Sequence, residues 1–523
     1  MDTILVLDYG GQTSQLISRR IRDLGYYSVI LPGQIRIDSK EFLKVKNELK
    51  GIIFSGSPHS VYKRESPSPD NRIYSLGIPI LGICYGLQLI VQDHGGEIAP
   101  LEREEYGRTK IFYRMNGRES PLFKGIPDGF SSWMSHGDSI KKVPPGFEIL
   151  ADSENKLVSV LFNGEKNIYG VQFHPEVSHC EYGTTILDNF AGKICEAKKE
   201  WSLDRYIEKT VDTIKEKVGD KEILLLISGG VDSSVLAALL LRSVKPKRVH
   251  LMYIDTGLMR KGESEEVFKN LKKLGAKNIH IIDARDEFLN GLRGITNPEK
   301  KRRVIGDLFI EIQERETKRL GITSDYLAQG TLYTDMIESG KGVGKNANVI
   351  KSHHNVRSPL VEKKRLEGKL IEPLSILYKD EVRRLGLKLG LSEDIVYRHP
   401  FPGPGLAVRI LGEVTEEKCN ILREADYIFI EQLKKRNLYR KIWQAFAVLL
   451  PVKSVGVTGD ARGYRYVLAL RAVTSSDGMT ADVYPFEMKD ILEISGKITN
   501  EVKEIGRVVY DVSSKPPATI EWE

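Results

Sequence analysis

Cysteine is scarce in this sequence: its 523 residues include only Cys84, Cys180, Cys195 and Cys419. Thiols this few and scattered exclude a disulfide framework, and the absence of a C-x-x-C pair argues against a structural zinc site. An uncharged apolar run of roughly 18 residues, long enough to span a bilayer, is also missing. The first residues lack the basic segment and long apolar stretch of a signal peptide. These absences favour a cytoplasmic protein in a reducing compartment.

A strong charge of either sign is missing too. Lys and Arg number 78 against 71 Asp and Glu, so the net charge of +7 is small for the chain length, and no basic tail is present. This balance suits anionic small molecules such as nucleotides, and it gives no reason to expect nucleic acid or a membrane as a partner. The length suggests roughly three domains of an ordinary globular protein.

The first third of the sequence alternates apolar runs with glycine turns and helical patterns. Continuous apolar runs that end at glycine, such as residues 3–10 and 78–86, are typical of strands buried on both faces of a parallel sheet. Two later runs joined through Asn163-Gly164 predict a β-hairpin. A charged helical segment follows, so we expect a first α/β domain over residues 1–197.

The rest of the chain predicts two further domains. Strands expected at 222–228, 248–255, 278–283 and 324–330, with a helix at 298–320, indicate a second doubly wound α/β domain over residues 203–398. A proline- and glycine-rich loop, "RHPFPGPGL", follows and cannot form a helix or a central strand. Beyond it the pattern changes, and we expect a small α+β domain with an antiparallel sheet over residues 399–523.

Cys84 lies between the apolar run 78–83 and a helical pattern, and Tyr85-Gly86 follows it directly. A sharp strand-to-helix turn at this point would expose the thiol near a helix N-terminus, where backbone N–H groups lower a thiol pKa. This is the cysteine counterpart of the nucleophile elbow. The alternative is an ordinary buried cysteine, which is the commoner fate of a single Cys.

A second motif, "QFHPE", favours the nucleophile. Its proline ends a predicted strand just after His174, which could deprotonate the thiol, and Glu176 could orient the imidazole. A single His at a strand end is usually only a polar cap. A cysteine elbow combined with His-Pro-Glu in one α/β domain is much more specific.

With these two motifs, residues 1–195 resemble the class I glutamine amidotransferases, and neither motif departs from the family pattern. The resemblance implies that Cys84 attacks the glutamine carboxamide to form a thioester, and that His174 protonates the leaving ammonia and then activates water. It also implies an oxyanion hole of backbone N–H groups from Gly56 and Tyr85, and glutamine contacts from Gln88 and the loop 133–138.

The stretch "LISGGVDSS" predicts a phosphate-binding loop between a strand and a helix, yet it lacks the lysine of G-x-x-x-x-G-K-[ST]. Glycines allow close backbone approach, serines add hydroxyl donors, and the helix offers its positive end. A carboxylate here would repel phosphate unless a cation lies between them, so Asp232 predicts Mg²⁺. The alternative is a plain glycine turn with a capping serine. The predicted phosphate-binding residues are Ser228, Gly229, Gly230, Val231, Asp232, Ser233 and Ser234.

This loop resembles the pyrophosphate loop of the N-type ATP pyrophosphatases, which cut ATP between the α- and β-phosphates. The resemblance implies an adenosine contact at the end of the next strand, where Asp255 lies. A glutaminase motif before this loop and "KPPATIEWE" at the end of the third domain extend the likeness over the whole chain, to the glutamine-hydrolysing GMP synthase family. That family converts XMP to GMP with ATP and glutamine through an adenyl-XMP intermediate, and it dimerises through its third domain.

The same resemblance implies the residues that bind XMP. They are Arg302, Arg409, Lys515, Ile520 and Glu521, with a phosphate contact from Lys351. Taken alone, Arg302 reads as part of a solvated helix face and Lys515 as part of a frayed terminus. Two departures from the family pattern, Arg357-Ser358 and Thr458, fall near the substrate regions and leave the XMP contacts there open.

Three rival functions share part of this pattern. A glutamine-dependent NAD synthetase would share the ATP loop but carry a different glutaminase, without His-Pro-Glu. A tRNA-modifying enzyme would add a basic extension or cysteines beside the loop. A glutamine-sensing protein with an inactive glutaminase would have lost part of the Cys84, His174 and Glu176 set. The NAD synthetase would also not need the third domain.

Overall fold

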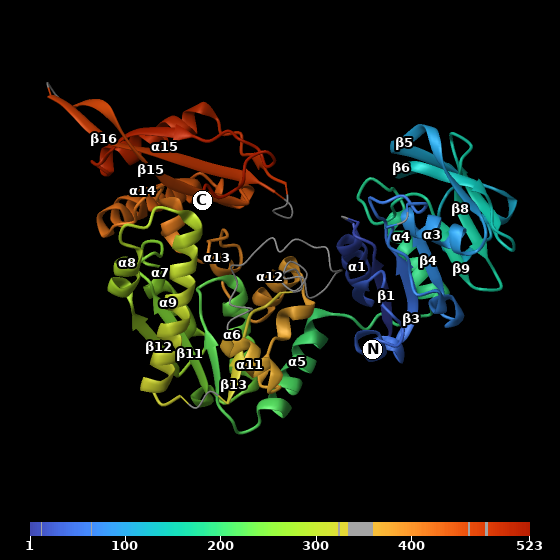
Figure 1. The fold of residues 1–523 in the computed structure, drawn as a ribbon, viewed down its shortest axis with the longest axis horizontal. Helices are drawn as coiled ribbons and strands as arrows, with labels where there is room; N and C mark the ends of the chain where they lie inside the picture. Colours follow the sequence, from blue (N-terminus) through green and yellow to red (C-terminus); the bar gives the residue numbers. More distant parts are fainter. Residues whose placement is uncertain (12, 64, 323–324, 333–358, 459–460, 476–479) are drawn as a thin grey trace. The chain divides into compact units, whose positions relative to one another are not determined.

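The structure is a computed structural model that describes the whole chain except residues 12, 64, 323–324, 333–358, 459–460 and 476–479 (Figure 1). The described part of the chain forms two compact units, residues 1–206 and residues 207–332 with 359–523, and the boundary in the sequence lies within helix α5 (Leu203–Val218). Mixed helices and sheets fill both, which confirms the expected α/β class. Among the described residues, no helix is long and apolar enough to cross a membrane.

The first unit is built on a nine-stranded sheet in the order β2-β1-β3-β4-β9-β8-β7-β5-β6. Its strands are β1 (Thr3–Asp8), β2 (Tyr27–Pro32), β3 (Leu49–Phe54), β4 (Ile80–Ile83), β5 (Glu97–Tyr113), β6 (Phe130–Lys142), β7 (Glu148–Ser153), β8 (Val158–Asn163) and β9 (Ile168–Val171). Its α-helices are α1 (Ser14–Asp23), α2 (Lys40–Lys46), α3 (Tyr85–Asp93) and α4 (Gly183–Asp188).

The apolar runs of the first unit form the parallel part of this sheet. Strands β2, β1, β3, β4 and β9 pair in parallel, and all four residues of β4 are buried, as expected for a strand covered on both faces. The predicted hairpin is present, since β8 and β9 pair antiparallel with Asn163 opposite Ile168. The parallel strands therefore end at one edge, where β4 is followed by Cys84 and β9 leads to His174.

The second unit contains a five-stranded parallel sheet in the order β12-β11-β10-β13-β14. Its strands are β10 (Ile223–Leu226), β11 (Val249–Asp255), β12 (Asn278–Asp283), β13 (Tyr326–Ala328) and β14 (Leu370–Ile371). The associated helices are α6 (Val231–Ser243), α7 (Glu263–Lys273), α8 (Arg285–Leu292), α9 (Pro298–Arg319), α11 (Pro359–Leu366), α12 (Lys379–Lys388) and α13 (Glu393–Val396). The strand order reverses at β10, so the loop after β10 lies where open α/β sheets bind ligands.

A second sheet of the same unit consists of β15 (Gln444–Thr458), β16 (Ala461–Thr474), β17 (Asp482–Val483) and β18 (Ile505–Tyr510). The expected antiparallel sheet is only partly correct. β16 pairs antiparallel with β15 and β17 but in parallel with β18. The chain reaches β18 through helix α15 (Met488–Glu501), and a helical crossover of this kind is what a parallel pairing needs.

One hydrophobic cluster runs through both sheets of the second unit. It includes Leu224 of β10, Phe429 of helix α14 (Glu416–Lys435), Leu468 of β16 and Ile498 of α15. The segments 203–398 and 399–523 thus share a core. Their separation into two domains stays a prediction from the sequence.

The last residues of the chain are held by a buried arginine. Arg471 of β16 is fully buried, donates from Nη2 to the Thr519 carbonyl at 3.2 Å, and pairs from Nη1 with Asp511 Oδ2 at 3.3 Å. It also donates to the Ser513 carbonyl. Buried charges are retained when several partners satisfy them, so Arg471 fixes the path of residues 511–519.

We predict that Arg471→Leu releases the C-terminal tail, because three backbone and carboxylate acceptors lose their shared donor. The destabilisation should be about 3 kcal/mol, the usual result of breaking a buried ionic network. Limited proteolysis followed by mass spectrometry should show early cleavage after residue 510. Arg507→Leu, at an exposed position of β18, is the matched control and should resist cleavage like the parent protein.

Candidate active sites

Cys84 occupies a strained turn between β4 and α3. Its backbone has φ 52° and ψ −104°, a region that non-glycine residues rarely adopt. Gly86 lets the helix approach β3 closely, because a Cβ there would lie 2.4 Å from the Phe54 carbonyl oxygen. The predicted strand-to-helix turn is therefore present, and backbone strain of this kind is typical of a nucleophile. The expected exposure of the thiol is not found, because Cys84 is only 6% exposed.

His174 and Glu176 lie beside this turn because β4 pairs with β9. The Cys84 N–H donates to the Val171 carbonyl at 2.8 Å, and the chain continues from Val171 to His174. His174 Nδ1 lies 2.7 Å from Glu176 Oε1, and Glu176 is fully buried. A carboxylate only accepts, so Nδ1 carries the proton in this pair.

The electrostatics of His174 favour its charged form. Burial lowers the pKa of the His174 imidazole, but the charges of Glu176 and Cys84 outweigh this and hold that pKa well above its usual range. An imidazole held in this way stabilises a neighbouring thiolate. The arrangement can therefore supply both a nucleophile and an acid for a leaving group.

The two predicted oxyanion donors, Gly56 and Tyr85, lie next to His174 and Cys84 respectively. A Cβ at Gly56 would be 3.1 Å from His174 Cε1, so the Gly56 backbone lies against the imidazole. Tyr85 is the first residue of α3, where backbone N–H groups have no partner within the helix. The roles of Gly56 and Tyr85 stay predictions.

The segment 133–138, predicted as a loop, is instead part of strand β6. Its polar, glycine-containing sequence is typical of a loop, but pairing with β5 outweighs that local preference. Ser135 places its carbonyl 3.8 Å from Cys84 Sγ, and Gln172 Nε2 lies 3.7 Å from the same sulfur. Gln88 donates from Nε2 to the Asp138 carbonyl at 3.1 Å, so it joins α3 to β6.

In the second unit, the loop after β10 is folded by its own serines. The Ser228 and Ser233 hydroxyls lie 3.2 Å apart, and Ser233 and Ser234 donate to the Gly230 carbonyl at 3.1 and 2.9 Å. Gly229 has φ 78°, and a Cβ there would meet Val267 at 2.8 Å. Gly230 caps α6, and Val231 begins it. The helix N-terminus thus opens onto the predicted phosphate position.

Asp232 is paired with a lysine that sequence reasoning missed. Lys379 Nζ lies 2.8 and 2.7 Å from the two carboxylate oxygens of Asp232. Lys379 is the first residue of α12, where a cation opposes the helix dipole. That unfavourable position was the only sequence signal for it. Lys379 supplies from another helix the positive charge that the loop itself lacks.

Asp255 ends β11 and organises the turn that follows. Its Oδ1 accepts from the Gly257 N–H and its Oδ2 from the Ser264 hydroxyl, both at 3.0 Å.

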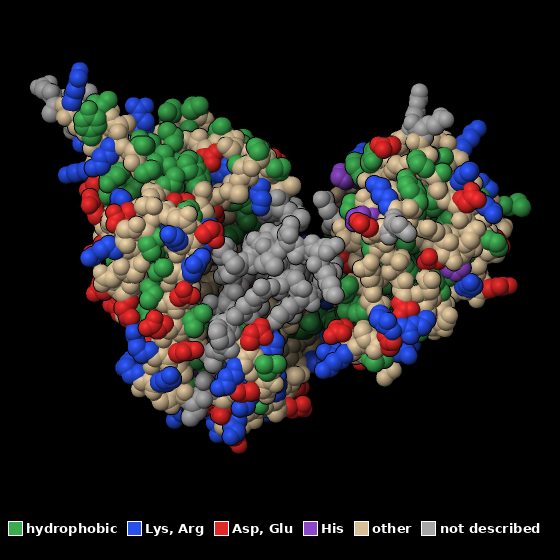
Figure 2. Space-filling model, in the orientation of Figure 1, with side chains coloured by type: hydrophobic (Ala, Val, Ile, Leu, Met, Phe, Trp, Pro, Cys, Tyr) green, Lys and Arg blue, Asp and Glu red, His purple; other side chains and the backbone are tan. Residues whose placement is uncertain are grey.

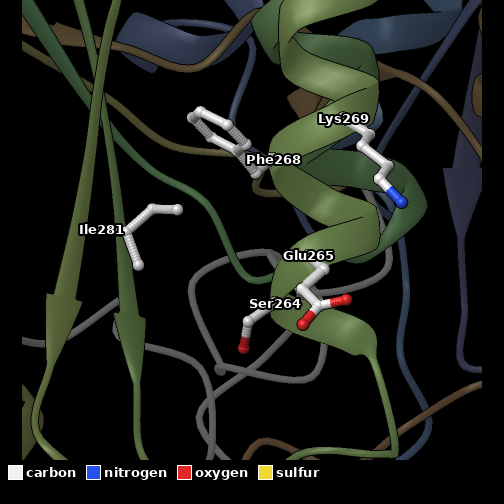
Figure 3. A pocket seen from close by; sticks show the side chains of 5 residues that line it. All are labelled: Ser264, Glu265, Phe268, Lys269 and Ile281. Carbon is white, nitrogen blue, oxygen red and sulfur yellow. The ribbon is translucent and has the colours of Figure 1, made fainter.

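A cavity of about 790 Å³ opens beside Asp255, and a smaller apolar one of about 330 Å³ lies between α7 and edge strand β12. Phe268 and Ile281 line the smaller cavity (Figure 3).

Two of the predicted XMP-binding residues, Arg409 and Glu521, form an ion pair. Arg409 donates from Nε and Nη2 to the Glu521 carboxylate at 3.1 and 2.8 Å, and Gln444 donates to the same carboxylate at 2.7 Å. Arg409 is fully buried between the rings of Phe401 and Phe446. Its Nη1 has no hydrogen-bond partner among the described residues.

Helix α9 reaches the same tail from the other side. Arg302 donates to Glu299 at 2.8 Å and to the Glu523 carbonyl. Its neighbour Lys301, which sequence reasoning did not single out, is fully buried and lies 2.6 Å from Glu523 Oε2 and 2.7 Å from the Ile410 carbonyl. Its place within the basic run 300–303 gave no signal that it is buried.

The remaining predicted contacts are placed less directly. Ile520 is buried beside Phe446, and Lys515 forms a backbone bridge to Ala481. Thr458 ends β15, and its side chain is outside the described part of the chain. The predicted phosphate contact and the other departures also lie outside the described residues: Lys351, Arg357 and Ser358.

Comparisons with known proteins match the chain to one enzyme family. The model of the class-I glutamine amidotransferases matches residues 5–194, and the model of the GMP synthase C terminal domain matches residues 431–522. A glutamine-hydrolyzing GMP synthase of Aquifex aeolicus is 51% identical over 522 residues, 99% of each chain. One from Carboxydothermus hydrogenoformans is 50% identical over 520 residues, again 99% of each chain. The chain belongs to the family of glutamine-hydrolysing GMP synthases.

Proposed function

We propose that this protein converts XMP to GMP, with ATP cleaved to AMP and pyrophosphate and with ammonia taken from glutamine. This is the last step of de novo guanine nucleotide synthesis. The proposal rests on a sequence identity of 51% over 99% of the chain to a glutamine-hydrolysing GMP synthase, together with the Cys84–His174–Glu176 geometry. All four cysteines are free thiols, which suits a reducing cytoplasm.

In the glutaminase half-reaction, the Cys84 thiolate attacks the carboxamide carbon of glutamine. Backbone N–H groups of Gly56 and Tyr85 stabilise the oxyanion that forms. His174 gives its proton to the departing ammonia, which leaves a glutamyl thioester. His174 then takes a proton from water as the water attacks the thioester, and glutamate leaves. Glu176 keeps the imidazole oriented and favours its charged form.

In the synthetase half-reaction, the oxygen at position 2 of the xanthine base attacks the α-phosphorus of ATP. Adenylation is needed because this oxygen leaves poorly until it carries a phosphoryl group. Ammonia then displaces AMP at the base carbon. The loop 228–234 offers N–H and hydroxyl donors to the departing pyrophosphate, and Lys379 lies close enough to Asp232 to reach phosphates at the loop.

Asp232 fits the role of a magnesium ligand. Among the described residues, no cluster of three or more His, Cys, Asp or Glu side chains could hold a metal by itself. Mg²⁺ bound with a nucleotide needs only one or two carboxylates, because phosphates and water complete its shell. The ion would neutralise phosphate charge, and Lys379 would then turn from Asp232 to the phosphates.

The XMP site is proposed at the docked tail, where Arg302, Arg409 and Glu521 converge. The unpartnered Nη1 of buried Arg409 is the best-placed donor for XMP. Ile520 and Lys515 complete the set on the tail itself, and Lys351 is proposed to contact phosphate.

We propose a homodimer formed through the C-terminal segment. Hydrophobic side chains gather over β15, β16 and α15 on the surface of the second unit (Figure 2). Val455 and Tyr464 face each other across the β15–β16 hairpin and are 51% and 73% exposed, and Met488 and Leu492, one turn apart on α15, are 70% and 63% exposed. Apolar residues exposed in this way are typical of an interface. Nucleic acid and membranes are not among the proposed partners.

Cys84→Ala should abolish glutamine-dependent GMP formation and leave ammonia-dependent formation unchanged, because only the glutaminase uses the thiol. Steady-state assays with glutamine and with ammonium salts measure both. Cys180→Ala is the matched control: burial raises the pKa of the Cys180 thiol to about 11, so it is inert. A folded Cys84→Ala protein that fails with ammonia as well would contradict the proposed division of labour.

Lys379→Met should slow the synthetase about tenfold or more, since a charged hydrogen bond to phosphate is lost. The products from ATP, measured by chromatography with XMP and ammonia, should remain AMP and pyrophosphate. Lys388→Met, at the exposed far end of α12, should behave as the parent enzyme. Formation of ADP and phosphate by the parent enzyme would refute the adenylate mechanism.

Leu492→Lys should convert the dimer to a folded monomer, because a charge placed in a desolvated interface is costly. Sedimentation velocity at micromolar protein should give twice the chain mass for the parent protein and a single chain mass for the variant. Leu366→Lys, at an 88% exposed leucine at the end of α11, is the control and should stay dimeric. A monomeric parent protein would rule the dimer out.

A further inference from the structure

A buried histidine lies next to the nucleophile but outside the catalytic set. His136 of β6 is 5% exposed. Its Nδ1 lies 2.9 Å from the Asp138 carbonyl oxygen and its Nε2 lies 3.1 Å from Glu105 Oε2. A carbonyl oxygen and a carboxylate are both acceptors, so both hydrogen bonds form only when each ring nitrogen carries a proton.

The partner carboxylate, Glu105 of β5, is held in its charged form. Its Oε1 accepts from the Ser153 hydroxyl at 2.9 Å and from Asn155 Nδ2 at 2.7 Å. Burial raises the pKa of the Glu105 carboxyl, but hydrogen bonds from His136, Asn155 and Ser153 outweigh burial and keep that pKa below its usual range. His136 and Glu105 therefore form a hydrogen-bonded pair that is removed from water, with side chains 2% and 5% exposed.

This pair fixes the strand segment that borders Cys84. The Asp138 carbonyl accepts from His136 and also from Gln88 Nε2 at 3.1 Å, which fills both of its lone pairs. The Asp138 carboxylate accepts from the Tyr62 hydroxyl at 2.9 Å. At the other end of the segment, Ser135 places its carbonyl 3.8 Å from Cys84 Sγ. The backbone of residues 135–138 is thus tied to the start of α3 and to the nucleophile.

A buried ion pair is costly to keep, and well-packed apolar side chains would often be more stable in its place. Its retention here needs a reason other than stability. Ser153 and Asn155 hold Glu105, and the remaining bond of His136, from Nδ1, is directed at a single atom, the Asp138 carbonyl oxygen. A hydrogen bond to a charged group depends on direction, so it fixes the position of this oxygen more narrowly than apolar packing would.

We propose that His136, held by Glu105, is a positioning residue for glutamine, and that it acts by fixing the strand segment 135–138, whose Ser135 carbonyl lies 3.8 Å from Cys84 Sγ. His136 itself does not touch the substrate or the reacting atoms. The inference rests on the proposed glutaminase function and deepens it. It assigns glutamine affinity to the His136–Asp138 bond and the stability of this region mainly to the His136–Glu105 bond.

Two conservative variants separate these bonds. In His136→Gln, the side-chain amide can replace the Nε2–H bond to Glu105, but the Asp138 carbonyl loses one of its two donors and keeps only Gln88. In His136→Asn, the amide can replace the Nδ1–H bond to Asp138, but Glu105 is left as an unpaired buried charge. A residue with a purely structural role would show its largest kinetic defect in the less stable variant.

We expect the opposite order. His136→Gln should raise KM for glutamine about tenfold, with kcat changed less than about threefold and ammonia-dependent activity unchanged. His136→Asn should have the lower melting temperature and the smaller rise in KM. Alkylation of Cys84 by iodoacetamide, which lacks the amino-acid end of glutamine, should proceed at the parent rate in His136→Gln. His94→Asn is the matched control, because His94 Nδ1 lies 2.9 Å from the Ile90 carbonyl at the far end of α3.

Asn155→Ala keeps the test decisive should both His136 variants fail to fold. Asn155 is exposed, and its removal takes one donor from Glu105. KM for glutamine should rise about two- to threefold, and an unchanged KM would then overturn the inference. If the His136 variants fold, three results would overturn the inference. They are an unchanged KM for glutamine in His136→Gln, a fall in kcat without a change in KM, and a KM that rises most in the variant with the lowest melting temperature. A parent enzyme that uses no glutamine would instead refute the proposed function, and the inference with it.

Discussion

The parallel pairing of β4 with β9 is the constraint on which the first site depends. Cys84 and His174 are far apart in the sequence, and a backbone bond from Cys84 to Val171 brings the ends of their two strands to one edge. The turn at Cys84 and the proline after His174 then orient the two side chains toward each other. Glu176 follows from the same turn and sets the charge of the imidazole.

The second site distributes its charges over elements distant in sequence. The loop after β10 provides backbone donors and hydroxyls, α12 provides Lys379, and the tail meets Arg302 of α9 and the buried Arg409. In the proposed mechanism, the cation on a separate helix exchanges Asp232 for a phosphate without any change in the loop. The common loop with its own lysine does not offer this freedom.

Features encoded within one short segment were predictable from the sequence. The turn at Cys84, the hairpin through Asn163-Gly164 and helix α9 follow from local apolar runs, glycine and proline. Features that depend on a distant partner were not. Lys379 and Lys301 look like ordinary surface lysines until their partners are known, and the polar segment 133–138 becomes a strand only because β5 lies beside it. The parallel place of β18 also depends on a crossover that single-strand patterns do not contain.

The continuous hydrophobic cluster of the second unit has a thermodynamic consequence. Leu224 beside the ATP loop and Leu468 beside the docked tail belong to the same core, so neither sheet can lose its packing without exposing the apolar surface of the other. Cooperative unfolding requires this kind of shared burial. We therefore expect the parallel sheet that carries the loop 228–234 and the sheet that holds the C-terminal tail to unfold in a single transition on heating.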